Sequence, residues 1–207
     1  MSDSPVKLKI FSDYVCPWCY LGSDSVEKLA ARKDIDIEWI PFPLHPDTPP
    51  EGMSLKAWLG DGVDAAHQRL YQIMDSINLA YNPDRIMTYN SRLAQELGMW
   101  ADTQPGGSKL HKLIFQAYFV HDRNIAQPEV LLDCVKEAGL DVEAAREVLE
   151  QRRFSNQVDQ AWMSARQQQV SGVPSFVAGA YITSGYHPVE ELEKFIDYVE
   201  MQQARGA

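Results

Sequence analysis

The chain has 207 residues, of which 45% are hydrophobic and 23% charged, and its formal net charge is −10. We expect such a chain to fold into one large globular domain or two small ones. The negative charge argues against nucleic acid or an anionic membrane as a partner, because both are polyanions. No apolar run approaches the ~18 residues of a transmembrane helix. The N-terminal residues lack the basic start and apolar segment of a secretory signal, so we expect a cytoplasmic protein.

The N-terminal part of the chain predicts a strand, a helix and a second strand. Val6–Ser12 is a short apolar strand, and residues 12–15 form the turn into a helix from about Cys16 to Ala31. Ile35–Ile40 alternates apolar and polar residues, which is typical of a strand. Three such elements within about 35 residues predict a βαβ unit with a parallel strand pair.

The rest of the chain changes character twice. Residues 41–50 contain five prolines, which excludes a central strand or a helix interior and predicts a loop. Residues 54–170 show helical spacing throughout. Strand character returns on either side of Gly179-Ala180, a predicted hairpin turn, and a final amphipathic helix starts near Pro188. The predicted order is therefore β-α-β, a helical block, and β-β-α.

The most informative motif is Cys16-Pro17-Trp18-Cys19 at the start of the first helix. A helix N-terminus carries unpaired N–H groups and a partial positive charge, and both favour a thiolate over a thiol. The spacing puts the second sulfur on the same helical face, within reach of the first. We expect Cys16 to attack a disulfide and Cys19 to resolve the mixed disulfide. Pro17 and Trp18 are expected to tune the reduction potential, with Trp18 also exposed to the substrate.

Two alternatives for the cysteine pair remain on residue patterns alone. Half of a zinc site would need two more ligands, and the chain has no second Cys-x-x-Cys and no His-x₃₋₅-His pair. We therefore predict no metal. An inert pair of buried cysteines is the other alternative. It fits the position between strand and helix less well than a reactive pair does.

Residues far from this motif provide further candidates. Val173-Pro174 stands at the start of a strand, where the peptide bond is either cis or an ordinary trans bond. If it is cis, the backbone of Val173 faces outward and can pair with an extended substrate. His45, in the proline-rich loop, is a candidate substrate-binding residue if that loop folds back over the first helix. Cys134 lies in an apolar helical stretch, where packing is expected and a regulatory thiol is the alternative.

Taken together, two motifs resemble a known family. Phe11-Ser12-Asp13 with Cys16 to Gly22, and the segment Val170 to Phe176 with Ser184-Gly185, are similar to the FrnE-like branch of the DsbA thioredoxin-fold oxidoreductases. The resemblance covers nearly the whole chain. It implies that Val173-Pro174 is the cis-proline loop packed beside Cys16, and that Cys16 is the nucleophile. Kappa-class glutathione transferases and hydroxychromene-carboxylate isomerases, in the same superfamily, carry serine in place of Cys16.

The resemblance implies an α/β protein with a DsbA-like thioredoxin fold and a large all-helical insertion. Residues 1–53 and 171–207 would form the thioredoxin-like domain, and residues 54–170 the insertion. The expected activity is thiol–disulfide exchange of the reductase or isomerase type. The alternatives are a glutathione-dependent isomerase or transferase acting on a small aromatic molecule, and a binding protein in which the cysteines are vestigial.

The expected partners follow from the chemistry of disulfide exchange. The substrate is a disulfide- or thiol-containing protein or small molecule. No cofactor is needed beyond the Cys16–Cys19 pair, although glutathione can act as a co-substrate. The chain is expected to be a monomer or a homodimer.

Overall fold

A computed structural model describes residues 5–59 and 63–206. Its elements follow the chain in this order: β1 (Val6–Ser12), α1 (Pro17–Ala30), β2 (Ile35–Pro41), β3 (Met53–Ser54), α2 (Leu55–Leu59), α3 (Val63–Ser76), β4 (Met87–Thr88), α4 (Arg92–Ala101), α5 (Lys109–Phe119), α6 (Pro128–Ala138), α7 (Val142–Glu150), α8 (Ser155–Gln167), β5 (Ser175–Ala178), β6 (Tyr181–Ser184) and α9 (Val189–Gly206).

The central sheet has the strand order β2-β1-β5-β6. β1 and β2 pair in parallel, with Val6 opposite Ile35, as the βαβ pattern predicted. β5 pairs antiparallel to β1, with Phe11 opposite Ser175, and β6 pairs antiparallel to β5. This pairing puts the end of β1 next to the start of β5, so that residues from both ends of the chain meet at one end of the two central strands.

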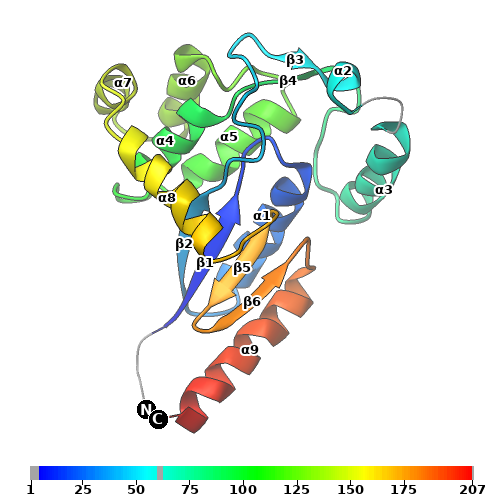
Figure 1. Ribbon diagram of the computed structural model, residues 1–207, viewed down its shortest axis with the longest axis vertical. Helices are drawn as coiled ribbons and strands as arrows, with labels where there is room; N and C mark the ends of the chain where they lie inside the picture. Colours follow the sequence, from blue (N-terminus) through cyan, green and yellow to red (C-terminus); the bar gives the residue numbers. More distant parts are fainter. Residues whose placement is uncertain (1–4, 60–62, 207) are drawn as a thin grey trace.

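Helices cover both faces of this sheet (Figure 1). On one face, apolar residues of α1 and α9 pack against the strands, among them Leu29, Leu192 and Ile196. α9 therefore packs on the sheet of its own chain. On the other face, Ala165 of α8 packs with Phe11 of β1.

The segment between β2 and β5 is mostly helical and lies beyond the end of β1 that leads into α1 (Figure 1). Its core contains the fully buried residues Leu97, Leu110, Ile114, Phe115 and Tyr118. The same apolar cluster includes Cys16, Cys19, Tyr20 and Leu21 of the first turns of α1. The helical segment thus packs directly against the cysteine pair.

The observed boundaries differ from the sequence prediction in a few places. α1 starts at Pro17, and Cys16 is its N-cap residue. β3 and β4 form a two-stranded ladder that the sequence did not predict, because two-residue strands leave no periodic pattern.

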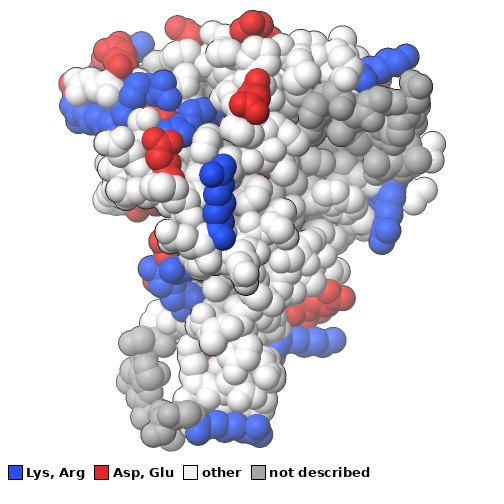
Figure 2. All heavy atoms as spheres, viewed as in Figure 1, with Lys and Arg blue, Asp and Glu red and all other residues white. Residues whose placement is uncertain are grey.

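The charged side chains on the face shown in Figure 2 are of both signs, and many gather around α7 and the nearby end of α8. Ion pairs account for several of them, including Glu143 with Arg146 and Glu147 with Arg153. Within the part of the chain that the structure describes, no helix is both long and apolar enough to cross a bilayer.

Candidate active site

Cys16 occupies the N-terminal end of α1. Its backbone is extended (φ −86°, ψ 116°), and its carbonyl accepts hydrogen bonds from the N–H groups of Cys19 and Tyr20, both at 3.1 Å. Pro17 follows at the first helical position, where its missing N–H costs no intrahelical bond. The Cys16 sulfur therefore lies at the positive end of the helix dipole.

Both cysteines of the motif are free thiols and both are buried, with 3% of Cys16 and 1% of Cys19 exposed. Cys16 is therefore hardly more exposed than Cys19. Burial raises the pKa of the Cys19 thiol well above its usual value, and the adjacent Cys16 adds to the rise. Cys19 therefore stays protonated near neutral pH and does not compete as the first nucleophile.

The loop before β5 forms the second wall of the site. The Val173–Pro174 peptide bond is cis. The Cys16 thiol contacts the Val173 carbonyl oxygen at 3.6 Å, with the thiol as donor. The Pro174 carbonyl accepts a hydrogen bond from the Gly185 N–H (2.8 Å), and the Ser175 hydroxyl donates to the Gly172 carbonyl (2.8 Å). These bonds fix the shape of the loop and tie it to the end of β6.

A cavity of about 270 Å³ opens beside Cys16. Its lining comes from the start of α1, the proline-rich loop, the helical segment and Val173. The residues are Val15, Cys16, Pro17, Trp18, Leu44, Leu55, Leu70, Tyr71, Met74, Tyr81, Asn82, Arg85, Tyr118, Phe119 and Val173. The cavity therefore brings together four of the sequence candidates, Cys16, Pro17, Trp18 and Val173.

His45 lies one residue beyond the cavity-lining Leu44. Its side chain is half-buried, and burial lowers its pKa. Leu44, but not His45, is among the described residues that line the cavity. A direct role for His45 in substrate binding stays a prediction.

The turn before Cys16 is held by a buried carboxyl group. Asp13 accepts hydrogen bonds from the N–H groups of Val15 (3.2 Å) and Leu44 (3.1 Å), and so ties the turn to the proline-rich loop. Burial raises the pKa of Asp13, while hydrogen bonds from these groups and from Ser91 and Gln95 oppose the rise. Asp13 therefore links the cysteine turn, the proline-rich loop and α4.

A second buried network starts at Tyr14. Its hydroxyl contacts His111 Nδ1 at 2.6 Å, and His111 Nε2 contacts Asp102 at 2.8 Å. Gly98 makes room for this arrangement, since a Cβ there would lie 2.3 Å from the Tyr14 hydroxyl oxygen. The network fastens the active-site turn to α4 and α5.

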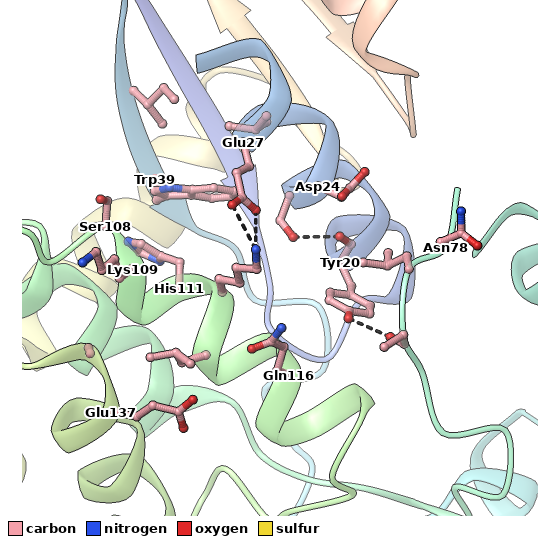
Figure 3. A pocket seen from close by; sticks show the side chains of 18 residues that line it. Tyr20, Asp24, Glu27, Trp39, Asn78, Ser108, Lys109, His111, Gln116 and Glu137 are labelled. Carbon is pink, nitrogen blue, oxygen red and sulfur yellow. Dashed lines mark hydrogen bonds and ion pairs between the residues drawn. The ribbon is translucent and has the colours of Figure 1, made fainter. Parts of the chain in front are cut away.

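A larger cavity, about 710 Å³, lies between α1 and α5 (Figure 3). Trp39, His111 and Tyr20 line it, and a Lys112–Glu27 ion pair (2.8 Å) lies along it. The Tyr20 hydroxyl donates to the Ala80 carbonyl at 2.7 Å. None of the described residues that line this cavity is a cysteine, whereas Cys16 lines the smaller cavity.

Sequence reasoning missed Asp13, Tyr14 and Arg85 as parts of the site. Asp13 and Tyr14 lie within the predicted turn, where a short polar side chain is a signal for turn hydrogen bonds. Arg85 has no such signal, because it lies in an irregular segment and reaches the cavity only through tertiary packing.

Comparison with known proteins agrees with this geometry. Residues 7–197 match the family described as DSBA-like thioredoxin domain. The uncharacterized protein YwbO of Bacillus subtilis (strain 168) is 28% identical over 198 aligned residues, and the match covers 92% of this chain and 96% of the relative. The probable DsbA oxidoreductase SCO1869 from Streptomyces coelicolor is 26% identical, with a TM-score of 0.84 over 94% of this chain and 89% of that one.

A second solved structure shows that the same fold occurs in a protein with another activity. A 2-hydroxychromene-2-carboxylate isomerase is 17% identical, with a TM-score of 0.76 over 97% of this chain and 99% of that chain. The predicted DsbA-like thioredoxin fold is therefore confirmed, whereas the activity has to be argued from the residues at the site.

Proposed function

The chain belongs to the DSBA-like thioredoxin domain family, and on this premise we propose that it is a thiol–disulfide oxidoreductase. The observation that carries the proposal is the position of Cys16. Its thiol lies at the N-terminus of α1, 3.6 Å from the Val173 carbonyl and beside a cavity, with Cys19 one turn further along. The FrnE-like branch, to which the motifs are similar, is part of this proposal.

The proposed reaction proceeds in two exchanges. The Cys16 thiolate attacks one sulfur of a substrate disulfide, and the other half of the substrate leaves as a thiol. Cys19 then attacks Cys16 and releases the second half, leaving a Cys16–Cys19 disulfide. The raised pKa of Cys19 supports this order, because that thiol becomes nucleophilic only when a base removes its proton. The Val173 backbone is proposed to bind the substrate next to Cys16.

We propose that the exchange runs as reduction or isomerisation, in the cytoplasm. A glutathione pool at roughly −220 to −320 mV would keep an oxidising DsbA-like pair reduced. Glutathione or another thiol then serves as the co-substrate that restores the two thiols. Pro17 and Trp18 are proposed to tune the potential. The helical insertion, residues 54–170, is proposed to select the substrate, since most of the cavity wall comes from it.

A glutathione-dependent isomerase or transferase is the second candidate. One observation favours it: the cavity beside Cys16 is lined by aromatic side chains, among them Tyr71, Tyr81 and Phe119, which suits a small aromatic substrate. The presence of both Cys16 and Cys19 favours the oxidoreductase, because an isomerase that uses the thiol of bound glutathione has no need of a second protein thiol.

Turnover of disulfides separates the two candidates. The wild type, with dithiothreitol as reductant, is assayed on insulin and on bis(hydroxyethyl) disulfide beside Cys16→Ser and Cys134→Ser. We expect turnover of at least one disulfide by the wild type and by Cys134→Ser, and background rates for Cys16→Ser. Absence of turnover by the wild type on both, together with its retention on a glutathione column, would support the isomerase or transferase instead.

A further inference from the structure

The cavity beside Cys16 contains an unusual cation. Of the described residues that line the cavity, Arg85 is the only charged one. Its side chain is only 9% exposed, and its guanidinium carbon lies 4.0 Å from the centre of the Tyr118 ring and 4.9 Å from that of Phe119. A positive charge is thus held between aromatic rings in a cavity of an otherwise acidic protein.

The hydrogen-bonding capacity of Arg85 is not filled by the protein. Its Nη2 donates to the Met87 carbonyl at 3.2 Å. Its Nε forms an ion pair with Asp122 Oδ1 at 3.5 Å, but among the described residues neither of these two buried atoms has a hydrogen-bond partner. A guanidinium has five N–H donors, and buried donors that lack acceptors are costly. A ligand with a carboxylate would supply the missing acceptors, in a paired geometry that suits arginine.

The rest of the cavity wall defines the body of such a ligand. Tyr71 and Tyr81 stack with their ring centres 4.4 Å apart and an angle of 9° between the rings. Leu44, Leu55, Leu70 and Met74 add aliphatic surface. About 270 Å³ suits a small molecule better than a folded protein segment. The wall therefore fits a flat or apolar body with one anionic group.

We propose that this cavity binds a low-molecular-weight disulfide with a carboxylate on an aromatic or apolar body, and that Arg85 holds the carboxylate while Cys16 attacks the disulfide. The inference rests on the proposed function and names its substrate class. The Cys16 thiolate forms a bond to the sulfur of the bound half, and the other half leaves as a thiolate that takes up a proton.

The second exchange completes the electron balance. Cys19 attacks the Cys16 sulfur, and the acidic half leaves as a second thiolate, which takes up the proton that Cys19 gives up. The substrate gains two electrons and becomes two thiols, and the enzyme loses two and becomes a disulfide. An added dithiol, such as dithiothreitol, returns the enzyme to its reduced form and is itself oxidised to a disulfide.

The test compares two probes with the same aromatic disulfide, one with free carboxylates and one with these groups esterified. Reduced protein is mixed with dithiodibenzoate, an aromatic disulfide with a carboxylate on each half, or with its dimethyl ester, and thiol release is followed in a single turnover. The proteins are the wild type, Arg85→Gln, Arg85→Lys and the control Arg146→Gln, whose exposed arginine pairs with Glu143. Taking the ratio of wild type to variant for each probe removes the different intrinsic reactivities of the probes.

We expect Arg85→Gln to slow the reaction with the diacid by about 10-fold or more, which is the effect of losing one charged hydrogen bond. The reaction with the ester should slow by less than about 2-fold. Arg85→Lys should retain part of the wild type's preference for the diacid over the ester, and Arg146→Gln should retain all of it. An equal loss on both probes, or no loss on the diacid, would overturn the proposal. Failure of wild-type Cys16 to react with either probe would instead overturn the proposed function itself.

A competition experiment on the wild type does not depend on the folding of a variant. Benzoate should slow the reaction of Cys16 with the dimethyl ester, and benzamide at the same concentration should not. Equal effects of benzoate and benzamide would also overturn the assignment of Arg85 as the carboxylate-binding group.

Discussion

The Cys16 sulfur lies 3.6 Å from the carbonyl oxygen of Val173, although the two residues are 157 positions apart in the sequence. The sheet brings them together. Phe11 near the end of β1 pairs with Ser175 at the start of β5, so the turn that leads to Cys16 and the loop that carries Val173 emerge side by side. The site is therefore a product of the strand order, and both ends of the chain must be folded for it to exist.

The three cysteines should differ widely in reactivity. Burial raises the pKa of Cys134 to about 11, so that only about one in a thousand of its thiols is ionised at pH 8. The pKa of Cys19 is also raised by burial. Brief treatment of the reduced protein with iodoacetamide between pH 7 and 9, followed by peptide mapping, should label Cys16 first. Cys134 should be labelled only after unfolding in urea. Labelling of Cys134 or Cys19 in the folded protein as fast as Cys16 would contradict this order.

The Gly98→Ala substitution should destabilise the protein despite the better helix propensity of alanine. The new Cβ would lie 2.3 Å from the Tyr14 hydroxyl oxygen, whose bond to His111 would have to break. We expect a loss of about 1–3 kcal/mol in the free energy of unfolding, measured in urea. Gly22→Ala in α1 is the matched control. Its Cβ would make an ordinary 3.5 Å contact with Pro174, so its effect should range from neutral to about 1 kcal/mol of stabilisation. A Gly98→Ala protein as stable as the wild type would show that the Tyr14–His111 bond is dispensable.

Asp13→Asn should lower stability by an amount that depends on pH. Asparagine has only one acceptor oxygen, so either the Val15 or the Leu44 N–H group faces an amide NH₂ and loses its hydrogen bond. This loss should lower the free energy of unfolding by about 1–3 kcal/mol. The pKa of Asp13 is raised in the folded protein. Its contribution to stability is therefore fully present below the ordinary value of 3.8, and it is lost as pH rises through the raised folded value.

In urea unfolding, the stability difference between the wild type and Asp13→Asn should accordingly shrink as pH rises from about 4.5 to about 7.5. Asp141→Asn is the control. Asp141 caps α7 by accepting from the Glu143 and Ala144 N–H groups, and asparagine is an equally good cap, so little change is expected. A difference that grows with pH would show that the folded protein does not raise the Asp13 pKa.

The sequence predicted the parts of this protein whose signals are local. The apolar run before Cys16, and Pro17 directly after it, are enough to locate the end of β1 and the start of α1. The Gly179-Ala180 turn is visible in the same way. Each depends on a few adjacent residues, so no knowledge of the tertiary structure is needed.

The parts that escaped prediction depend on contacts between distant residues. Tyr14 meets His111 across 97 positions, and neither residue carries a pattern that identifies its partner. Arg85 belongs to no long element, and its position over Tyr118 follows from the packing of α5. The cavity that these contacts leave beside Cys16 is therefore a result of the fold, and its charge and shape could not be predicted from spacing.

Trapping the mixed disulfide tests the central claim most directly. Reduced Cys19→Ser protein is incubated with a disulfide such as dithiodibenzoate, digested without reductant and mapped by mass spectrometry, beside Cys16→Ser treated in the same way. We predict one adduct per chain, located on Cys16 and released by dithiothreitol, and no adduct in Cys16→Ser. An adduct on Cys134 alone, or none on Cys16 in a folded protein, would contradict the assignment of Cys16 as the nucleophile of a thiol–disulfide oxidoreductase.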